Sequence, residues 1–312
     1  MPSQDSLTAH PPLTRRQSLT ILLAIAASGC SSTAPPAEPP PIEVPVVPPP
    51  KPPPKPPRIG LALGGGAARG FAHIGVIQVL EENGIRPDLV IGTSAGSLVA
   101  ALYAAGKTGT ELATVAAGMD EGALTDWSYP GRGLIRGEAL ARYVREKTGG
   151  LLIEQMRMPL GIVATNLSSG EGILFRSGDT GMAVRASSAV PAVFQPVKIG
   201  NQEFVDGGLV APVPVRYARQ MGAELVIAVD ISSPPDAIAP QDAMRMLMQT
   251  FSIMGRSINT LELREADVVL RPKLSDVGSS DFGGRQRAIK AGREIAKALL
   301  PAIRATIAAK TR

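Results

Sequence analysis

Short apolar runs alternate with longer amphipathic stretches along most of this chain. The apolar runs are typical of buried strands, and stretches with apolar residues three or four positions apart are typical of helices. The predicted strands are 59–63, 89–91, 162–164, 225–229 and 268–270, with 173–175 and 203–205 as further candidates. The predicted helices are 68–83, 94–105, 138–147, 213–221, 241–264 and 285–308.

Strands that alternate with helices predict an α/β fold. A mainly parallel central sheet is then covered by helices on both faces, which gives three layers, α/β/α. The pattern begins near residue 58 and contains no internal repeat, so we predict one domain over residues 58–312. Because 44% of the residues are hydrophobic, a chain of this length can bury a sizeable core.

Residues 1–30 have the features of a processing segment. Arg15 and Arg16 precede a nine-residue apolar run, which is too short to span a bilayer, where about 18 or more residues are needed. Ala27-Ser28-Gly29-Cys30 then resembles the lipobox of bacterial lipoproteins, although that motif usually has Leu in place of Ala27. The resemblance implies a lipoprotein-type signal peptide and an acylated Cys30. The arginine pair also resembles a twin-arginine export signal, so the export route stays open.

Residues 31–57 form a proline-rich linker. Fourteen of the 23 residues from Pro35 to Pro57 are proline, which favours an extended polyproline II conformation at about 3.1 Å per residue. The linker is either a semi-rigid spacer or a disordered tether. Together with Cys30, it predicts a protein anchored to a membrane surface in the bacterial cell envelope, on the periplasmic face of the outer membrane.

Composition excludes several kinds of site. Histidine occurs only as His10 and His73, and cysteine only as Cys30, so neither a metal site built on several imidazoles nor an internal disulfide can form. Aromatic residues make up 4% of the chain, which argues against a base-stacking platform for nucleic acid, although the net charge is +5. We therefore predict no metal and no nucleic-acid partner.

Gly92-Thr93-Ser94-Ala95-Gly96 lies between a predicted strand and a predicted helix. In that context G-x-S-x-G is typical of a sharp turn that exposes a nucleophilic serine, with glycines that let neighbouring backbone pass close. Ser94 is therefore the candidate nucleophile, supported by Gly92 and Gly96. The alternative is a purely structural turn.

A nucleophilic serine needs a base, and histidine is scarce here. His10 lies in the predicted signal peptide, and His73 lies within a predicted helix, where we expect it to pack or form a hydrogen bond beneath the turn. A carboxylate or a lysine must then activate Ser94. Asp206, followed by Gly207 and Gly208, is the best carboxylate candidate, because burial would make it more basic. Read alone, Asp-Gly-Gly is more often a simple turn.

A glycine-rich loop, Gly64-Gly65-Gly66-Ala67-Ala68-Arg69-Gly70, joins the first predicted strand to the first helix. Its backbone amides could hold an anion. Neither G-x-x-x-x-G-K-[ST] nor G-x-G-x-x-G is present, so a nucleotide phosphate is a poor candidate. An oxyanion hole formed by Gly64, Gly65, Gly66 and Ala67 is the preferred interpretation, and plain turn geometry is the alternative.

These three motifs, in this order, resemble the patatin-like phospholipase family, and the resemblance covers about residues 59–230. Ala186-Ser187-Ser188-Ala189-Val190-Pro191 and Pro212-Val213-Pro214-Val215 also look like family segments. The resemblance implies a Ser94–Asp206 dyad without histidine. It also implies an oxyanion hole in the glycine-rich loop, which Arg69 and Gly70 support. The implied partner is a phospholipid or another lipid ester.

Two further segments bear on lipid contact. Residues 285–312 carry eight basic side chains and one acidic one, Glu294, on a predicted helix that either packs on the domain or attracts anionic lipid. Met244, Leu247, Met248, Phe251 and Met254 share one side of another helix and predict a core-packing face, with an acyl-chain pocket or lid as the alternative. The irregular stretch 120–133, with Trp127 and Tyr129, could line a mouth.

The sequence thus predicts a serine acyl hydrolase of lipids, of the phospholipase A or lysophospholipase type, that acts through an acyl-enzyme. This hydrolase chemistry needs no cofactor. Two alternatives remain. One is an esterase or thioesterase that acts on soluble esters. The other is a non-catalytic lipid-binding envelope lipoprotein that keeps the fold.

Overall fold

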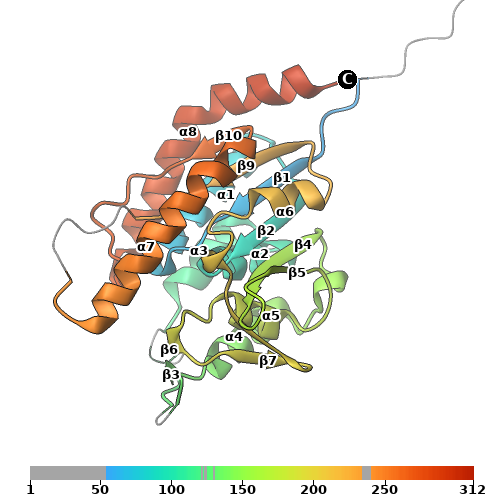
Figure 1. Ribbon diagram of the computed structural model, residues 1–312. Coiled ribbons are helices and arrows are strands. Elements are labelled where there is room, and N and C mark those ends of the chain that lie inside the picture. Colours follow the sequence, from blue (N-terminus) through green and yellow to red (C-terminus); the bar gives the residue numbers. More distant parts are fainter. Residues whose placement is uncertain (1–53, 121, 123–124, 129–130, 234–239) are drawn as a thin grey trace, which may run out of the picture. The chain divides into compact units, whose positions relative to one another are not determined.

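Buried strands form one mixed, mostly parallel central sheet (Figure 1). A computed structural model describes residues 54–120, 122, 125–128, 131–233 and 240–312. The predicted signal peptide, Cys30, Tyr129 and all but the last four residues of the predicted linker lie outside the described residues.

The strand order across the sheet is β10-β9-β1-β2-β4-β8-β7, and β5 pairs with β4. The five strands from β10 to β4 run parallel, and β5, β8 and β7 add antiparallel pairs. A separate two-stranded parallel sheet pairs β3 with β6. The strands are β1 Ile59–Leu63, β2 Leu89–Thr93, β3 Gly133–Ile135, β4 Leu160–Asn166, β5 Gly172–Phe175, β6 Ala192–Phe194, β7 Val197–Ile199, β8 Gln202–Asp206, β9 Leu225–Val229 and β10 Val268–Leu270.

Helices surround this sheet, which confirms the predicted α/β fold. The α-helices are α1 Phe71–Glu82, α2 Ala95–Ala104, α3 Gly109–Ala117, α4 Glu138–Thr148, α5 Thr180–Ser187, α6 Val215–Gln220, α7 Ala243–Glu262 and α8 Arg285–Lys310. The 3₁₀ turns are η1 Ala67–Gly70, η3 Ile153–Gln155, η4 Gly207–Leu209, η5 Leu263–Glu265 and η6 Phe282–Gly284.

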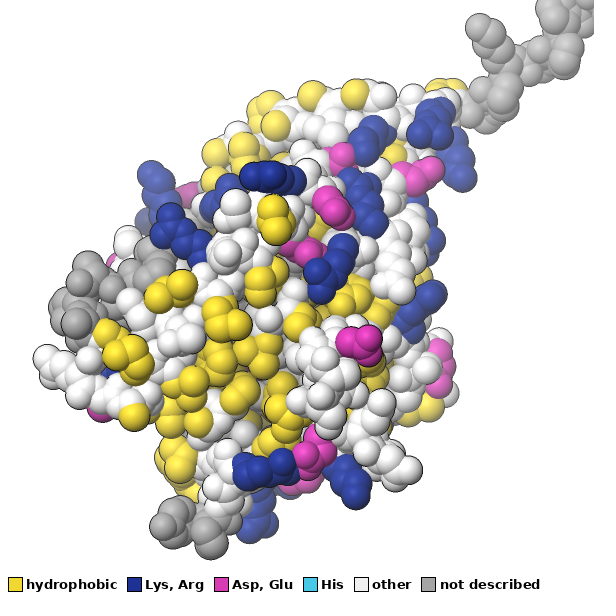
Figure 2. All heavy atoms as spheres, in the orientation of Figure 1, with side chains coloured by type: hydrophobic (Ala, Val, Ile, Leu, Met, Phe, Trp, Pro, Cys, Tyr) yellow, Lys and Arg dark blue, Asp and Glu magenta, His cyan; other side chains and the backbone are white. Residues whose placement is uncertain are grey.

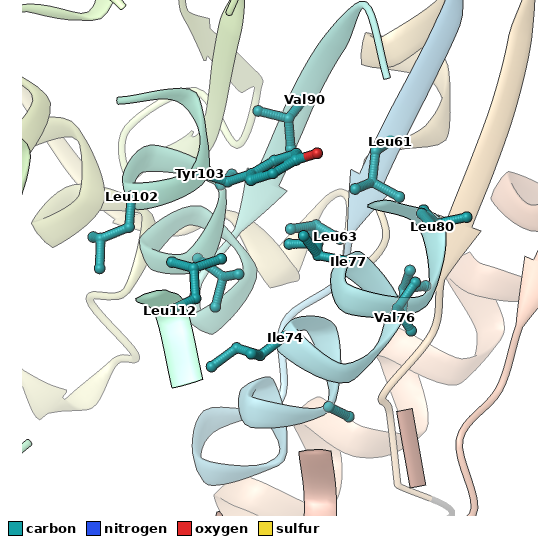
Figure 3. Close-up of a cluster of buried hydrophobic side chains, with 14 of the residues drawn as sticks. Leu61, Leu63, Ile74, Val76, Ile77, Leu80, Val90, Leu102, Tyr103 and Leu112 are labelled. Carbon is teal, nitrogen blue, oxygen red and sulfur yellow. The ribbon is translucent and has the colours of Figure 1, made fainter. Parts of the chain in front are cut away.

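Side chains on successive strand residues point to opposite faces of the sheet, and here both faces are buried. Leu61 and Leu63 of β1 pack in a cluster that includes residues of α1, α2, α3 and α8, several of which Figure 3 shows. Ala62 between them belongs to a second cluster, on the side of α6. Continuous apolar strands are the expected result of covering a parallel sheet on both faces.

Helix α8 packs along α1 rather than standing apart. Ala288, Ile289, Ala296 and Ile303 are buried, and a methyl group on Gly292 would lie only 2.0 Å from the carbonyl oxygen of Ala72. Several basic side chains of α8 form ion pairs, including Arg287 with Asp276 and Asp281, Arg293 with Glu82, and Lys310 with Asp267. Helix α8 therefore packs on the domain, which is the first of the two interpretations given for residues 285–312.

Helix α7 departs from the sequence expectation. Its buried residues are Asn259 and Glu262, whereas the methionine-rich side is half-buried or exposed. The predicted core-packing face is only partly packed, because Leu247, Met248 and Phe251 are half-buried whereas Met244 and Met254 are exposed. No helix in the described ranges is both long enough and apolar enough to cross a membrane.

Candidate active site

The candidate nucleophile lies on a sharp turn between β2 and α2. Ser94 has φ 52° and ψ −124°, a left-handed conformation that costs a non-glycine residue free energy. Its amide donates a hydrogen bond of 2.9 Å to Ser187 Oγ, and Ser187 Oγ donates one of 2.6 Å to the carbonyl oxygen of Val163. The surrounding structure thus holds Ser94 in the strained geometry that the G-x-S-x-G pattern predicts.

Close backbone contacts explain the two glycines of this turn. A methyl group on Gly96 would lie 2.1 Å from the carbonyl oxygen of Leu63, and one on Gly92 would lie 2.3 Å from the carbonyl oxygen of Gly96. Both distances are far below van der Waals contact. Only glycine at these positions lets α2 start directly over the end of β1.

The candidate base reaches Ser94 from β8, which ends at Asp206. Ser94 Oγ donates a hydrogen bond of 2.7 Å to Asp206 Oδ2, although the two residues are 112 positions apart in the chain. The amide of Gly208 donates to Asp206 Oδ1 at 2.7 Å, and Thr165 Oγ1 donates to the backbone carbonyl of Asp206 at 2.8 Å. The carboxylate is therefore fixed on both oxygens and aimed at the serine.

Burial alters the acidity of this carboxyl group. Asp206 is 6% exposed, and removal from water raises its pKa from 3.8 to about 6, although the hydrogen bonds from Ser94 and Gly208 act in the opposite direction. A carboxylate with a pKa near 6 is mostly deprotonated at neutral pH and is more basic than an exposed aspartate. Both properties suit a general base.

The glycine-rich loop runs beside the serine. A methyl group on Gly65 would lie 3.1 Å from Ser94 Cβ. The amides of Gly64 and Gly65 already donate to the carbonyl oxygens of Val229 at 3.0 Å and Pro212 at 2.9 Å. Within the described part of the chain, no acceptor is found for the amides of Gly66 and Ala67, which begin η1. These two are the amides of the predicted oxyanion hole that an added anion could still engage.

The arrangement matches a known family. A model for patatin-like phospholipases matches residues 61–219, slightly more than half of the 312 residues. The chain belongs to the patatin-like phospholipase family. The matched range contains the glycine-rich loop, Ser94 and Asp206.

Other proteins share this patatin-like sequence and fold. An uncharacterized NTE family protein of Mycobacterium bovis is 35% identical over 207 residues, covering 65% of this chain and 57% of the relative. Lysophospholipase NTE1 of Pyricularia oryzae is 28% identical over 268 residues, covering 75% of this chain and 18% of the relative. The patatin-like chain thus spans less than two thirds of either relative. VipD of Legionella pneumophila, with a TM-score of 0.54 over 78% of this chain and 66% of VipD at 16% identity, shares the fold.

The other residues predicted for this patatin-like site serve its framework. Arg69 Nε lies 3.4 Å from the carbonyl oxygen of Gly66 and donates to it. A methyl group on Gly70 would lie 2.8 Å from Ala95 Cβ, and one on Gly207 would lie 2.1 Å from the carbonyl oxygen of Val163. Among the described residues, no three His, Cys, Asp or Glu side chains are grouped so that they could hold a metal ion.

Two residues of the site had no role predicted from sequence. Ser187, which holds the Ser94 amide, lies in a segment whose only sequence signal is its resemblance to the family. Thr165, which holds the Asp206 carbonyl, had no local signal at all. Both hydroxyls act through backbone atoms of residues far away in sequence, so only the fold reveals them.

His73 lies next to the loop rather than next to the serine. Its Nε2 is 2.8 Å from the carbonyl oxygen of Gly64, so this nitrogen must carry the proton and donate. The ring is fully buried, and burial lowers its pKa from 6.5 to about 4. A neutral histidine bonded to Gly64 steadies the loop and is not placed to take a proton from Ser94.

We expect His73→Gln to lower the free energy of unfolding by about 1–3 kcal/mol, because it disturbs a buried hydrogen-bonded side chain. The same variant should keep kcat/KM for ester hydrolysis within about tenfold of wild type, because His73 does not touch the reacting atoms. Urea unfolding and hydrolysis of a nitrophenyl ester measure the two quantities. A folded His73→Gln protein as inactive as Ser94→Ala would reinstate a histidine base.

Proposed function

We propose that this protein is a serine acyl hydrolase of lipids, of the phospholipase A or lysophospholipase type. The observation that carries the proposal is the 2.7 Å hydrogen bond from the strained Ser94 to the buried Asp206. The family assignment and the similarity to Lysophospholipase NTE1 support a lipid ester as the substrate.

In the proposed mechanism, Ser94 Oγ attacks the carbonyl carbon of an acyl ester while Asp206 takes the hydroxyl proton. The amides of Gly66 and Ala67 bind the negative oxygen of the tetrahedral intermediate. The intermediate collapses when the alcohol leaves with the proton from Asp206, and Ser94 keeps the acyl group. Asp206 then takes a proton from water as the water attacks the acyl-enzyme. Fatty acid is released, and the proton returns to Ser94.

The environment of Ser94 supports this sequence of steps. The start of α2 behind Ser94 favours the negative charge that develops there. The raised pKa of Asp206 suits a group that must both accept and return a proton. We also propose that Cys30 carries the lipid anchor and that the protein acts in the bacterial cell envelope, on the periplasmic face of the outer membrane.

Substrate class is tested with the full chain and three substrates: phosphatidylcholine vesicles, lysophosphatidylcholine and a short nitrophenyl ester. We expect fatty acid to be released from the phospholipid or the lysophospholipid, with a higher kcat/KM than for the short ester. Ser94→Ala, tested on the same samples, is the control for contaminating lipase. Hydrolysis of the short ester alone would favour a soluble-ester hydrolase. A folded protein that cleaves none of the three would favour the non-catalytic alternative.

A further inference from the structure

Helix α7 presents an uncharged apolar strip to its surroundings. Four large side chains of α7 point away from its buried residues: Met246 is 54% exposed, Ile253 53%, Met254 46% and Leu261 65%. They recur about every two turns along one side of the helix, with the uncharged Thr250 and Ser257 between them. A surface helix normally turns its charged side chains outward, so this face is not an ordinary solvated one.

The opposite side of helix α7 lies against the candidate active site. A methyl group on Gly255, in the middle of α7, would lie 3.5 Å from Pro212 Cγ, and the carbonyl oxygen of Pro212 accepts the hydrogen bond from the Gly65 amide. Pro212 therefore lies between helix α7 and the loop beside Ser94. Figure 2 shows hydrophobic side chains gathered over the lower part of α7 and between α7 and β6.

Further exposed apolar residues lie on and beside the strand that pairs with β6. The Asp206 amide donates to the carbonyl oxygen of Ala189, three residues before β6, and β6 pairs with β3. Leu134 of β3 is 44% exposed, and Trp127, which is paired with the adjacent Ile135, is 71% exposed. We call the outward residues of α7 together with Trp127 and Leu134 the apolar rim.

The charged residues beside the apolar rim favour contact with a lipid surface over contact with another binding partner. From residue 243 to residue 261, α7 contains two arginines and no acidic residue. Arg245 and Arg256 are exposed and eleven residues apart, about three turns, so both flank the strip on the same side; Arg245 also pairs with Asp242, the exposed residue that caps the helix. Helices that lie in a membrane interface combine an apolar face with basic flanks, and tryptophan is enriched at the same depth.

We propose that the apolar rim docks on a lipid surface that holds the proposed lipid substrate. This inference rests on the proposed lipid substrate, but the contact with lipid itself does not depend on turnover. The lipid anchor would hold the protein near the membrane, and the rim would set which side of the domain faces it.

Trp127 allows a direct test, because it is the only tryptophan in the sequence. The full chain carrying Ser94→Ala is mixed with phosphatidylglycerol–phosphatidylcholine vesicles, with and without brominated acyl chains. We expect Trp127 emission to shift to shorter wavelength and to be quenched by bromine. Residues 1–53 are present in every sample, so any contribution from them is common to all variants.

The test variant combines Met246→Gln, Ile253→Gln and Met254→Gln in the same chain. We expect it to weaken vesicle binding, measured from Trp127 quenching, by about tenfold or more, because three apolar side chains no longer gain from leaving water. The matched control places three glutamines at exposed alanines of α8, Ala298, Ala302 and Ala305, and should bind as the parent does. Circular dichroism confirms that each variant is folded.

Three results would overturn the docking proposal. The first is Trp127 emission that vesicles leave unchanged while the chain sediments with them. The second is quenching of the α7 variant equal to that of the α8 control. The third is a self-associating chain in which the α7 variant abolishes dimers and has no effect on quenching, since the rim would then cover a second copy. Quenching without any fatty acid release by wild type would instead contradict the proposed function and leave docking intact.

Discussion

Replacing Ser94 with alanine is expected to lower kcat/KM for ester hydrolysis by about 10⁴-fold or more, because it removes the hydroxyl that we propose forms the acyl-enzyme. The protein should remain folded. Alanine would not relieve the backbone strain of the turn, since residue 94 keeps the same left-handed conformation. Initial rates on lysophosphatidylcholine and on a nitrophenyl ester, measured at several enzyme concentrations, give the ratio directly.

Ser177→Ala is the matched control for this prediction, because Ser177 is an exposed serine that precedes α5. It should retain wild-type activity. A Ser94→Ala protein with an unfolding curve like that of wild type and more than about a tenth of its activity would show that the nucleophile is elsewhere.

Replacing Asp206 with asparagine is expected to lower kcat/KM by about 10³- to 10⁴-fold. Asparagine has nearly the same shape and can still accept from the amide of Gly208, so the framework should survive, but it cannot take the proton of Ser94. In wild type, kcat/KM should rise with pH through about 6 and level off above it, because the base must be deprotonated. Asp206→Asn should lack this rise, and a variant that keeps both the activity and the rise would exclude Asp206 as the base.

The same pKa has a consequence for stability. Burial places the pKa of Asp206 at about 6 in the folded protein, above the ordinary value of 3.8. The folded state therefore holds this proton more tightly than the unfolded chain does. Protonation of Asp206 thus contributes to the free energy of unfolding, and this contribution is complete below the ordinary pKa. It is lost as the pH rises through about 6. Wild type should lose stability relative to Asp206→Asn over that interval, as urea titrations at several pH values would show.

The sequence predicted the parallel core of the fold well, because continuous apolar strands separated by amphipathic helices have few other arrangements. The observed β1, β9 and β10 match their predicted ranges, and α4 and α8 differ from theirs by only one or two residues. Strands β3, β6 and β7 were not predicted: each has three residues, of which at most one is buried, so none forms the buried apolar run that marks a core strand.

Helix α3 was missed although it has a local signal. Thr108 accepts from the amide of Glu111, and the side chain of Glu111 accepts from the amide of Thr108, which is a capping box. That Thr-x-x-Glu pattern is readable in the sequence. Helix α5 also begins at a recognisable cap, Asp179, whose side chain accepts from the amide of Met182.

The site was only partly predictable, for a physical reason. Ser94 and Asp206 stand in local patterns that chemistry makes recognisable. Whether an amide of the glycine-rich loop is already hydrogen-bonded depends on carbonyl groups that only the fold brings near. The carbonyl groups of Val229 and Pro212 accept from Gly64 and Gly65, although they lie more than 140 residues away in the sequence. Likewise, the spacing of methionines on α7 shows that they share a face, but not whether another element covers it. The lipid anchor at Cys30 and the boundaries of the signal peptide and linker, at residues 30 and 57, stay predictions.

A fluorophosphonate that reacts only with activated serines tests the central claim, that Asp206 activates Ser94 for nucleophilic attack. Intact-protein mass spectrometry followed by peptide mapping would give the site and the rate of modification for wild type, Ser94→Ala and Asp206→Asn. We predict one adduct on Ser94 in wild type, no adduct in Ser94→Ala, and modification slowed by about 10³-fold in Asp206→Asn. An adduct on another serine, or equal rates in wild type and folded Asp206→Asn, would contradict the dyad.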